Sequence, residues 1–131
     1  MIGTLHHIGI AVANLEEALH RFATMGFQAG PPEVVASEDV RLAFVRSGDA
    51  QLELLESLTP DGVIGRFLAK RGEGLHHLAF RTPDIRAAIA DLRARGFQLL
   101  SEEPRRGHHG RLVAFIHPKS AHGVLLELVQ E

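Results

Sequence analysis

The chain has 131 residues, 45% of them hydrophobic, which is enough for one globular domain with its own core. Its formal net charge is −2 with scattered lysine and arginine residues, so composition excludes the basic surface that nucleic acids and acidic membranes require. The absence of cysteine excludes disulfides, thiol catalysis and cysteine-bound zinc. Since no signal-peptide pattern or membrane-spanning run is visible, we expect a cytoplasmic protein.

The first 58 residues predict a βαβββ module. Asn14 is the predicted N-cap of its helix and Gly26 ends that helix. A hairpin is predicted across Ser47-Gly48-Asp49. In chain order, the predicted elements are a strand over 6–12, a helix over 15–25, and strands over about 28–35, 40–47 and 50–56.

A short connecting helix is predicted over about 59–72. Thr59-Pro60-Asp61 has the pattern of a capped helix start with proline in the first turn, and Gly72 and Gly74 close the helix. Residues of about 73–131 then predict a second βαβββ module, with Asp84 as helix cap and Gly96 as helix end. Its predicted elements are a strand over 75–81, a helix over 84–95, and strands near 97–102, 111–117 and 123–129.

The two modules are copies of one unit. Leu5-His6-His7-Ile8 is restated by Leu75-His76-His77-Leu78 at an offset of 70 residues, and the similarity continues through both predicted helices. Residues 1–131 are too few for two separate cores. We therefore predict a single α+β domain in which two tandem modules share one core.

Strand alternation brings four metal-ligating residues into equivalent positions. His7 and His77 occupy matching positions of the first strands, and Glu53 and Glu127 lie between leucines in the closing strands. A carboxylate there is expensive to bury without a partner. If the modules pack about a pseudo-twofold axis, the four side chains gather on the concave side as a plausible set for a divalent metal. The alternative is that each is a structural or solvent-facing residue.

The remaining histidines are assigned smaller roles. His6 and His76 point to the opposite side of their strands, which favours structural or supporting positions. His20 lies on the polar face of its helix and is given no role. His108 and His109 lie in a glycine-flanked loop that either borders the site or is a solvated turn.

Five motifs resemble the vicinal oxygen chelate superfamily and, within it, the methylmalonyl-CoA epimerases over nearly the whole chain. The FLAKRGEGLHHLAF and HPKS blocks are the most specific of them. The motifs are His7-Ile8-Gly9-Ile10-Ala11-Val12, Glu53-Leu54-Leu55-Glu56, FLAKRGEGLHHLAF from Phe67 to Phe80, Glu103-Pro104-Arg105-Arg106-Gly107, and His117-Pro118-Lys119-Ser120 leading into Gly123-Val124-Leu125-Leu126-Glu127-Leu128.

The resemblance implies a cupped mixed sheet around one metal site. It implies that His7, Glu53, His77 and Glu127 bind a divalent cation, commonly Co²⁺, with Mn²⁺, Ni²⁺, Zn²⁺ and Mg²⁺ as alternatives. The implied reaction exchanges the 2R and 2S forms of an acyl-CoA, methylmalonyl-CoA, by removing and returning the α-proton. A homodimer is also expected.

The sequence departs from the family at the second base. Some members are thought to use a carboxylate that corresponds here to Leu42, although Glu38 and Asp39 are nearby in sequence. Epimerisation still needs a proton donor on each face of the α-carbon. We therefore expect the two carboxylate ligands, Glu53 and Glu127, to be the catalytic proton-transfer groups, with Glu38, Asp39 or a loop histidine as competitors.

The enlarged last hairpin predicts the contact with CoA. Lys119 and Ser120, with help from Arg111, offer a cation and a hydroxyl suited to phosphate, against the alternative of a solvated turn. Other functions of the same fold stay open. They are a glyoxalase I-type lactoylglutathione lyase, a less favoured extradiol dioxygenase, and a non-enzymatic protein that binds antibiotics.

Overall fold

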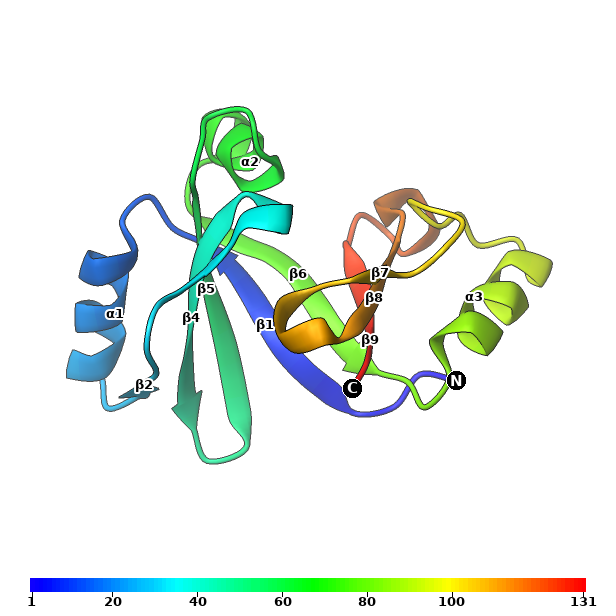
Figure 1. Cartoon of the computed structure of the whole chain (residues 1–131), viewed down its shortest axis with the longest axis horizontal. Coiled ribbons are helices and arrows are strands. Elements are labelled where there is room, and N and C mark those ends of the chain that lie inside the picture. The colour runs from blue at the N-terminus through cyan, green and yellow to red at the C-terminus, as the bar shows by residue number, and fades with distance from the viewer. The chain divides into compact units, whose positions relative to one another are not determined.

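The helices and strands follow the repeat in the sequence, in a computed structural model that describes residues 1–131 (Figure 1). The first half contains β1 (Leu5–Ala11), α1 (Leu15–Thr24), β2 (Gln28–Ala29), β3 (Glu33–Val35), β4 (Val40–Ser47), β5 (Ala50–Ser57) and α2 (Val63–Arg71). The second half contains β6 (Gly74–Arg81), α3 (Ile85–Ala94), β7 (Arg105–Arg106), β8 (Leu112–Ile116) and β9 (Leu126–Gln130). Short 3-10 helices are η1 (Ala36–Glu38), η2 (His108–Gly110) and η3 (Pro118–Ser120). The predicted α+β class is confirmed.

The chain packs as two units whose boundaries differ from those of the sequence repeat. The first unit is residues 7–76 and includes α2, and the second is residues 77–131 together with residues 1–6. Backbone hydrogen bonds attach the N-terminal segment to the second unit. The Gly3 N–H donates to the Arg81 carbonyl at 2.7 Å, and the Arg81 N–H donates to the Thr4 carbonyl at 2.9 Å.

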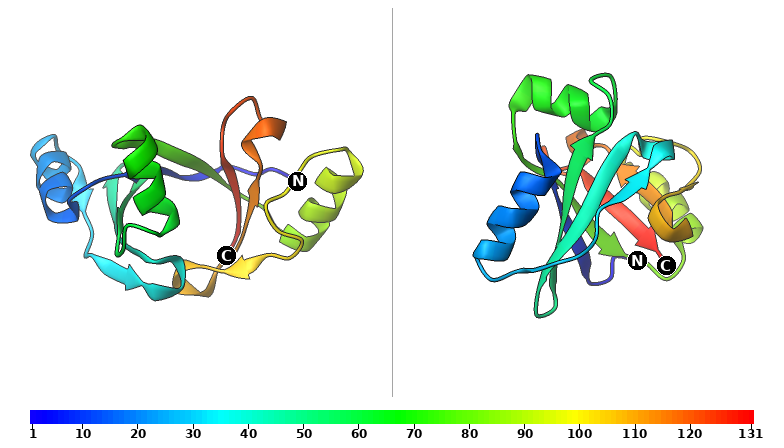
Figure 2. Two further views of the ribbon diagram at one scale, coloured as in Figure 1. Left: turned by 90° about the horizontal axis from the view of Figure 1, so that it is seen from above. Right: turned by 60° about the vertical axis from the view of Figure 1, so that its left-hand side comes forward.

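In the first unit, helices pack on both faces of a sheet with strand order β2-β4-β5-β1. β1 is parallel to β5, while β4 is antiparallel to β5, β2 and β3. On one face, α1 packs along the β4–β5 hairpin (Figure 2). On the opposite face, α2 covers the end of the sheet near Leu42 and Leu55. Ile64, Phe67 and Leu68 of α2 provide this cover.

Local signals predicted α1 correctly but misplaced the start of α2. The Asn14 side chain caps α1 by accepting from the Glu17 N–H, as predicted. Thr59 does not cap α2, since the helix begins at Val63 and the Thr59 hydroxyl donates to the Asp39 carboxylate. The Thr59 hydroxyl thus bonds to Asp39, which is 20 residues away in sequence, and not to the start of the helix.

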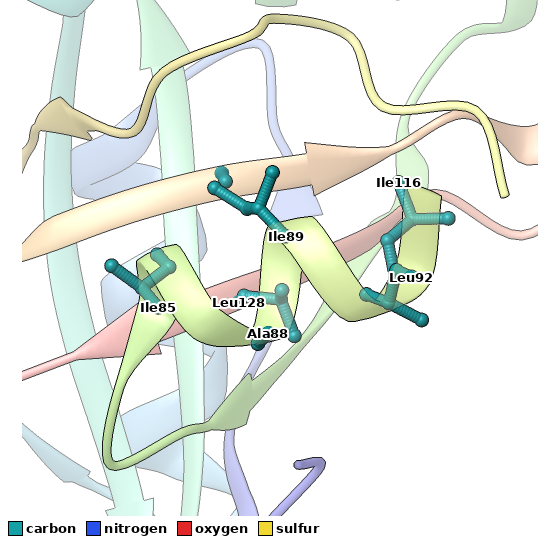
Figure 3. Close-up of a cluster of buried hydrophobic side chains, with 7 residues drawn as sticks. Ile85, Ala88, Ile89, Leu92, Ile116 and Leu128 are labelled. Carbon is teal, nitrogen blue, oxygen red and sulfur yellow. The ribbon is translucent and has the colours of Figure 1, made fainter. Parts of the chain in front are cut away.

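In the second unit, α3 packs against one face of a sheet with order β6-β9-β8-β7. β6 is parallel to β9, and the other pairs are antiparallel. Asp84 caps α3 as predicted, by accepting from the Ala87 N–H. The buried cluster between α3 and the sheet is shown in Figure 3. It consists of Ile85, Ala88, Ile89, Leu92, Ala114, Ile116 and Leu128.

Both units attach the start of their helix to the closing strand in the same way. Glu56 of β5 accepts a hydrogen bond from the Leu15 N–H at 2.8 Å. Gln130 of β9 accepts one from the Ile85 N–H, also at 2.8 Å. Each contact satisfies one of the N–H groups that a helix leaves unpaired at its first turn.

The strand predicted near residues 97–102 is wrong. Only Leu99 forms a bridge, to Ile116, and the short strand at this edge is β7. Around this bridge the Leu100 N–H donates to the Phe115 carbonyl and the His117 N–H donates to the Gln98 carbonyl. Beyond Leu100, Arg93 donates instead to the carbonyls of Ser101 and Glu102. None of the helices combines the length and apolar character that a membrane span requires.

Candidate functional site

The first unit carries a buried histidine–glutamate pair. β1 and β5 place Gly9 opposite Glu53, and His7 lies on the same face two residues earlier. His7 Nε2 is 3.4 Å from Glu53 Oε1, and the two residues are 4% and 7% exposed. The ring of Phe44, which lies directly opposite Glu53 on β4, meets His7 edge to face with centroids 5.8 Å apart.

The second unit repeats this arrangement. His77 Nε2 is 3.0 Å from Glu127 Oε1, and these residues are 6% and 7% exposed. Phe115 lies opposite Glu127 across β8 and β9 and meets the His77 ring edge to face, with centroids 6.0 Å apart. The pair and its supporting ring are therefore duplicated together.

The donor atoms of each pair fit a shared divalent cation. Two ligands bound at about 2.1 Å to one cation lie roughly 3 Å apart, as these imidazole nitrogens and carboxylate oxygens do. Imidazole and carboxylate together suit Zn²⁺, Co²⁺, Mn²⁺ and related ions. Within the units, His7 with Glu53 and His77 with Glu127 are thus two candidate pairs of metal ligands.

Two further histidines contact residues outside these pairs. His6 Nε2 is 3.6 Å from Glu131 Oε2, and His6 is only 4% exposed. The His76 ring packs edge to face on Phe67, with centroids 4.9 Å apart. His20 lies on an exposed position of α1.

The loop histidines form a stack in η2. The rings of His108 and His109 are 3.7 Å apart between centroids, with an interplanar angle of 27°. His109 has a left-handed backbone with φ of 58°, between two glycines at 107 and 110.

A catalytic base at position 42 would require the core around Leu42 to be repacked. Leu42 is on the same face as Glu53 but is only 3% exposed, because Ile64 of α2 packs over it. Of the nearby acids, Glu38 is half-buried at the end of η1. Asp39 accepts a hydrogen bond from Thr59.

The residues predicted to bind CoA do not form one cluster. β8 runs between Arg111 and the Pro118–Ser120 turn, which therefore lie at opposite ends of the strand. Ser120 Oγ accepts from the Gln98 N–H at 2.9 Å, and Arg111 is 3.5 Å from Glu131. Lys119 is left as the exposed cation of the turn.

Arg81 and Arg111 make Glu131 the centre of a charged cluster. Arg81 Nε lies 3.2 Å from one oxygen of Glu131. Partial burial raises the pKa of Glu131, but the hydrogen bond from Arg81 and the charges of His6, Arg111 and Arg81 outweigh it, so the pKa is lowered overall.

The supporting rings and Arg105 were not predicted from the sequence. The guanidinium carbon of Arg105 lies 5.6 Å from the centroid of the Phe115 ring, a cation–π contact. A signal for the rings was present, because Leu42-Ala43-Phe44 and Val113-Ala114-Phe115 precede the two closing strands in the same manner. Arg105 belongs to the Glu103–Gly107 motif, but no strand periodicity indicates which face it occupies.

The duplicated site and fold agree with a known family. The model of the glyoxalase/bleomycin resistance protein/dioxygenase superfamily matches residues 6–115. The chain belongs to this superfamily.

Within the superfamily, the resemblance to methylmalonyl-CoA epimerases is confirmed. The chain is 37% identical over 131 residues to the mitochondrial methylmalonyl-CoA epimerase of Bos taurus, covering 98% of this chain and 75% of the relative. It is 38% identical to the ethylmalonyl-CoA/methylmalonyl-CoA epimerase of Cereibacter sphaeroides, covering 99% of both. A solved Streptomyces coelicolor methylmalonyl-CoA epimerase in complex with 2-nitronate-propionyl-CoA has a TM-score of 0.91 and 41% identity, covering 100% of this chain and 99% of that one.

Proposed function

We propose that this superfamily member is a methylmalonyl-CoA epimerase. It exchanges the 2R and 2S forms by taking the proton from the carbon α to the thioester and returning one on the opposite face. The observation that carries the proposal is the duplicated buried histidine–glutamate pair, which offers two carboxylates in equivalent settings. The Cereibacter sphaeroides relative, which is named as an epimerase and matches this chain over 99% of both lengths, supports this reaction over others of the superfamily.

The proposal includes one divalent cation held jointly by His7, Glu53, His77 and Glu127, with Co²⁺ as the first choice. Its support is the donor chemistry of each pair, their burial and their repetition in both modules. When bound, such a cation supplies positive charge that stabilises the oxygen of an enolate. The rings of Phe44 and Phe115 hold the imidazoles in place and help exclude water from them.

Glu53 and Glu127 are the proposed proton-transfer groups. One carboxylate accepts the α-proton as the C–H bond breaks, and the electron pair of that bond moves into the enolate. The other carboxylate, in its acid form, then donates a proton to the opposite face of the same carbon. Duplication supports this pairing because it gives each unit one carboxylate of the same kind. The half-buried Glu38 is the competing second base.

The CoA end of the substrate is assigned to Lys119 and Ser120 in the η3 turn. An exposed lysine suits a phosphate, and the Ser120 hydroxyl stabilises the turn through its contact with Gln98. A homodimer is part of the proposal, on the resemblance alone.

Proton exchange with solvent tests the reaction directly. Purified protein loaded with Co²⁺ is incubated with methylmalonyl-CoA in deuterium oxide, and deuterium at the α-carbon is followed by mass spectrometry. Epimerisation predicts incorporation and interconversion of the two epimers. A parallel assay with methylglyoxal and glutathione tests lyase activity. Turnover there, without deuterium incorporation into methylmalonyl-CoA, would contradict the proposal.

A further inference from the structure

His117 caps the η3 turn with its side chain. Its Nδ1 atom accepts a hydrogen bond from the Lys119 N–H at 3.0 Å. Pro118 has no N–H to donate, and the Ser120 N–H donates to the His117 carbonyl at 2.9 Å. The imidazole therefore supplies the acceptor that completes the pairing of the N–H groups within η3.

The backbone of Gln98 holds both ends of this turn in the second unit. The His117 N–H donates to the Gln98 carbonyl at 2.8 Å, and the Gln98 N–H donates to Ser120 Oγ at 2.9 Å. His117 and Ser120 are half-buried, whereas Lys119 between them is exposed. The two anchored residues thus fix the chain on either side of Lys119, and the imidazole fixes the backbone N–H of Lys119 itself.

The equivalent hairpin of the first unit has no histidine cap. There, β4 and β5 pair as far as Ser47 and Ala50, and only Gly48 and Asp49 connect them. The cap is therefore found in the enlarged hairpin, which is the one that the proposed function assigns to the CoA phosphates.

The capping bond requires a neutral imidazole. A neutral imidazole that accepts a hydrogen bond at Nδ1 carries its proton on Nε2. An imidazolium has an N–H on both nitrogens, so a protonated His117 would present one donor to another at the Lys119 N–H. Histidine is the side chain that ordinarily changes its charge between about pH 5 and 8. Acid should therefore open this contact.

The neighbouring segments bring no carboxylate to the capping contact. Lys119 and His122 belong to the same loop, and both are exposed. Residues 97–100, which run beside His117, carry no charge. The first charged residue of β9 is Glu127, whose partner on β8 lies two residues before His117. An imidazolium in the turn would therefore meet the Lys119 N–H with no carboxylate from these segments to hold it in place.

We propose that His117 is a positioning residue whose neutral imidazole keeps η3 in the form in which Lys119 binds the CoA phosphates. This inference rests on the proposed function. The observed affinity of a ligand falls with the fraction of protein that is in the binding form. Protonation of His117 therefore weakens the binding of acyl-CoA.

Variants of the turn separate capping from other roles of the imidazole. CoA binding is measured by calorimetry at about pH 8, where histidine is ordinarily neutral. His117→Ala removes the acceptor and should weaken binding about 3- to 10-fold, the range for loss of one helix cap. His117→Asn should stay within about twofold of wild type, because an asparagine oxygen is a good cap. In a Lys119→Ala background, His117→Ala should have no further effect, since it acts through Lys119.

His122→Asn is the matched control. His122 is an exposed histidine in the same loop, and asparagine tolerates its left-handed backbone with φ of 54°. Its affinity for CoA should equal that of wild type at every pH. The thermal midpoint is measured for every variant, to verify that the fold is intact.

The pH dependence has a sign that a direct charge contact would not give. Between about pH 8 and 5.5, wild type should lose affinity relative to His117→Asn, which does not titrate at this position. The ratio of the two removes the protonation of the CoA phosphates, which affects both proteins alike. An imidazolium acting directly on the phosphates would strengthen binding in acid. This comparison needs no alanine variant, so it decides the question even if His117→Ala folds poorly.

The imidazole ¹⁵N resonances of wild type test the cap without CoA. Neutral His117 should carry its proton on Nε2. A proton on Nδ1, parallel pH dependence in wild type and His117→Asn, or an undiminished effect of His117→Ala in the Lys119→Ala background would each overturn the proposal. Wild-type protein that shows the expected tautomer but binds no CoA contradicts the proposed function, and with it any role of the cap in binding.

Discussion

His77 Nε2 and Glu127 Oε1 lie 3.0 Å apart on neighbouring strands that belong to the same unit. At this separation the imidazole nitrogen and the carboxylate oxygen are within hydrogen-bond distance of each other, and they are also close enough to bind one cation. The separation is shorter than the 3.4 Å between His7 and Glu53, so the second pair is the more closely spaced of the two.

We predict that His77→Ala loses metal while keeping the fold. Removing one of four ligands should lower the affinity for Co²⁺ by at least about 100-fold, more than is typical for a supporting residue. The core of this unit lies between α3 and the opposite sheet face and should be retained. Metal content after dialysis and the circular dichroism spectrum check this. The exposed His20→Ala is the control, and equal metal loss there would contradict the assignment.

We predict that Glu53→Gln and Glu127→Gln fail on different epimers. If one carboxylate serves each face of the α-carbon, each variant should abstract a proton from only one epimer, with the lost exchange slowed about 100-fold or more. Deuterium wash-in is followed separately from the 2R and 2S substrates, in variants shown to contain metal. Normal exchange from both epimers in Glu53→Gln would leave Glu53 a ligand only and favour Glu38 as the second base.

We predict that Lys119→Ala raises KM about 3- to 10-fold with little change in kcat, since an exposed ion pair to a remote phosphate contributes to binding and not to the chemical step. Steady-state kinetics over a range of methylmalonyl-CoA concentrations measure the two constants. Lys70→Ala, on the exposed side of α2, is the control. An unchanged KM would make the Pro118–Ser120 turn a simple solvated connection.

We predict that installing a carboxylate at Leu42 destabilises the protein instead of supplying a base. Leu42 is 3% exposed beneath Ile64, so Leu42→Glu should lower the free energy of unfolding by about 3 kcal/mol. Urea denaturation measures the change. Val34→Glu, on the neighbouring strand at 62% exposure, should change stability by less than about 0.5 kcal/mol. A stable Leu42→Glu variant with faster exchange would show that this position accepts a charge.

We predict that Glu131 contributes stability that is lost in acid. Its pKa is lowered in the folded protein, so the unfolded chain binds the proton more readily. The contribution is therefore complete above the unfolded pKa and disappears as the pH falls through the folded pKa. Glu131→Gln should be less stable than wild type at neutral pH, and the difference should narrow in acid. Urea denaturation at several pH values tests this, with Glu103→Gln as control. A difference independent of pH would contradict it.

Local sequence signals predicted the parts of the fold that local interactions determine. Asn14 and Asp84 could be predicted as caps from the sequence, because a cap acts on its own helix. Each accepts a hydrogen bond from the backbone N–H three residues later. Strand alternation also placed His7 with Glu53 and His77 with Glu127 on common faces, and within each unit the side chains do meet.

The wrong predictions involve partners that are distant in sequence. Thr59 does not cap α2, and its hydroxyl donates a hydrogen bond to the Asp39 carboxylate. Residues 97–102 form only a bridge at Leu99, and beyond Leu100 the side chain of Arg93 binds the carbonyls of Ser101 and Glu102. Arg105 was missed since a two-residue strand has no periodicity to detect, and its contact with Phe115 depends on register alone.

The first six residues belong to the second unit, and this affects the order in which the two units can fold during synthesis. Residues 7–76 have all the partners of their unit as soon as they leave the ribosome, whereas residues 1–6 emerge first and must wait for Arg81 to be synthesised. The second unit therefore combines a segment that precedes the first unit in the chain with the segment that follows it. A fragment that begins at His77 would lack the strand segment that pairs with Arg81, so dividing the chain at the repeat boundary would not yield two self-sufficient halves.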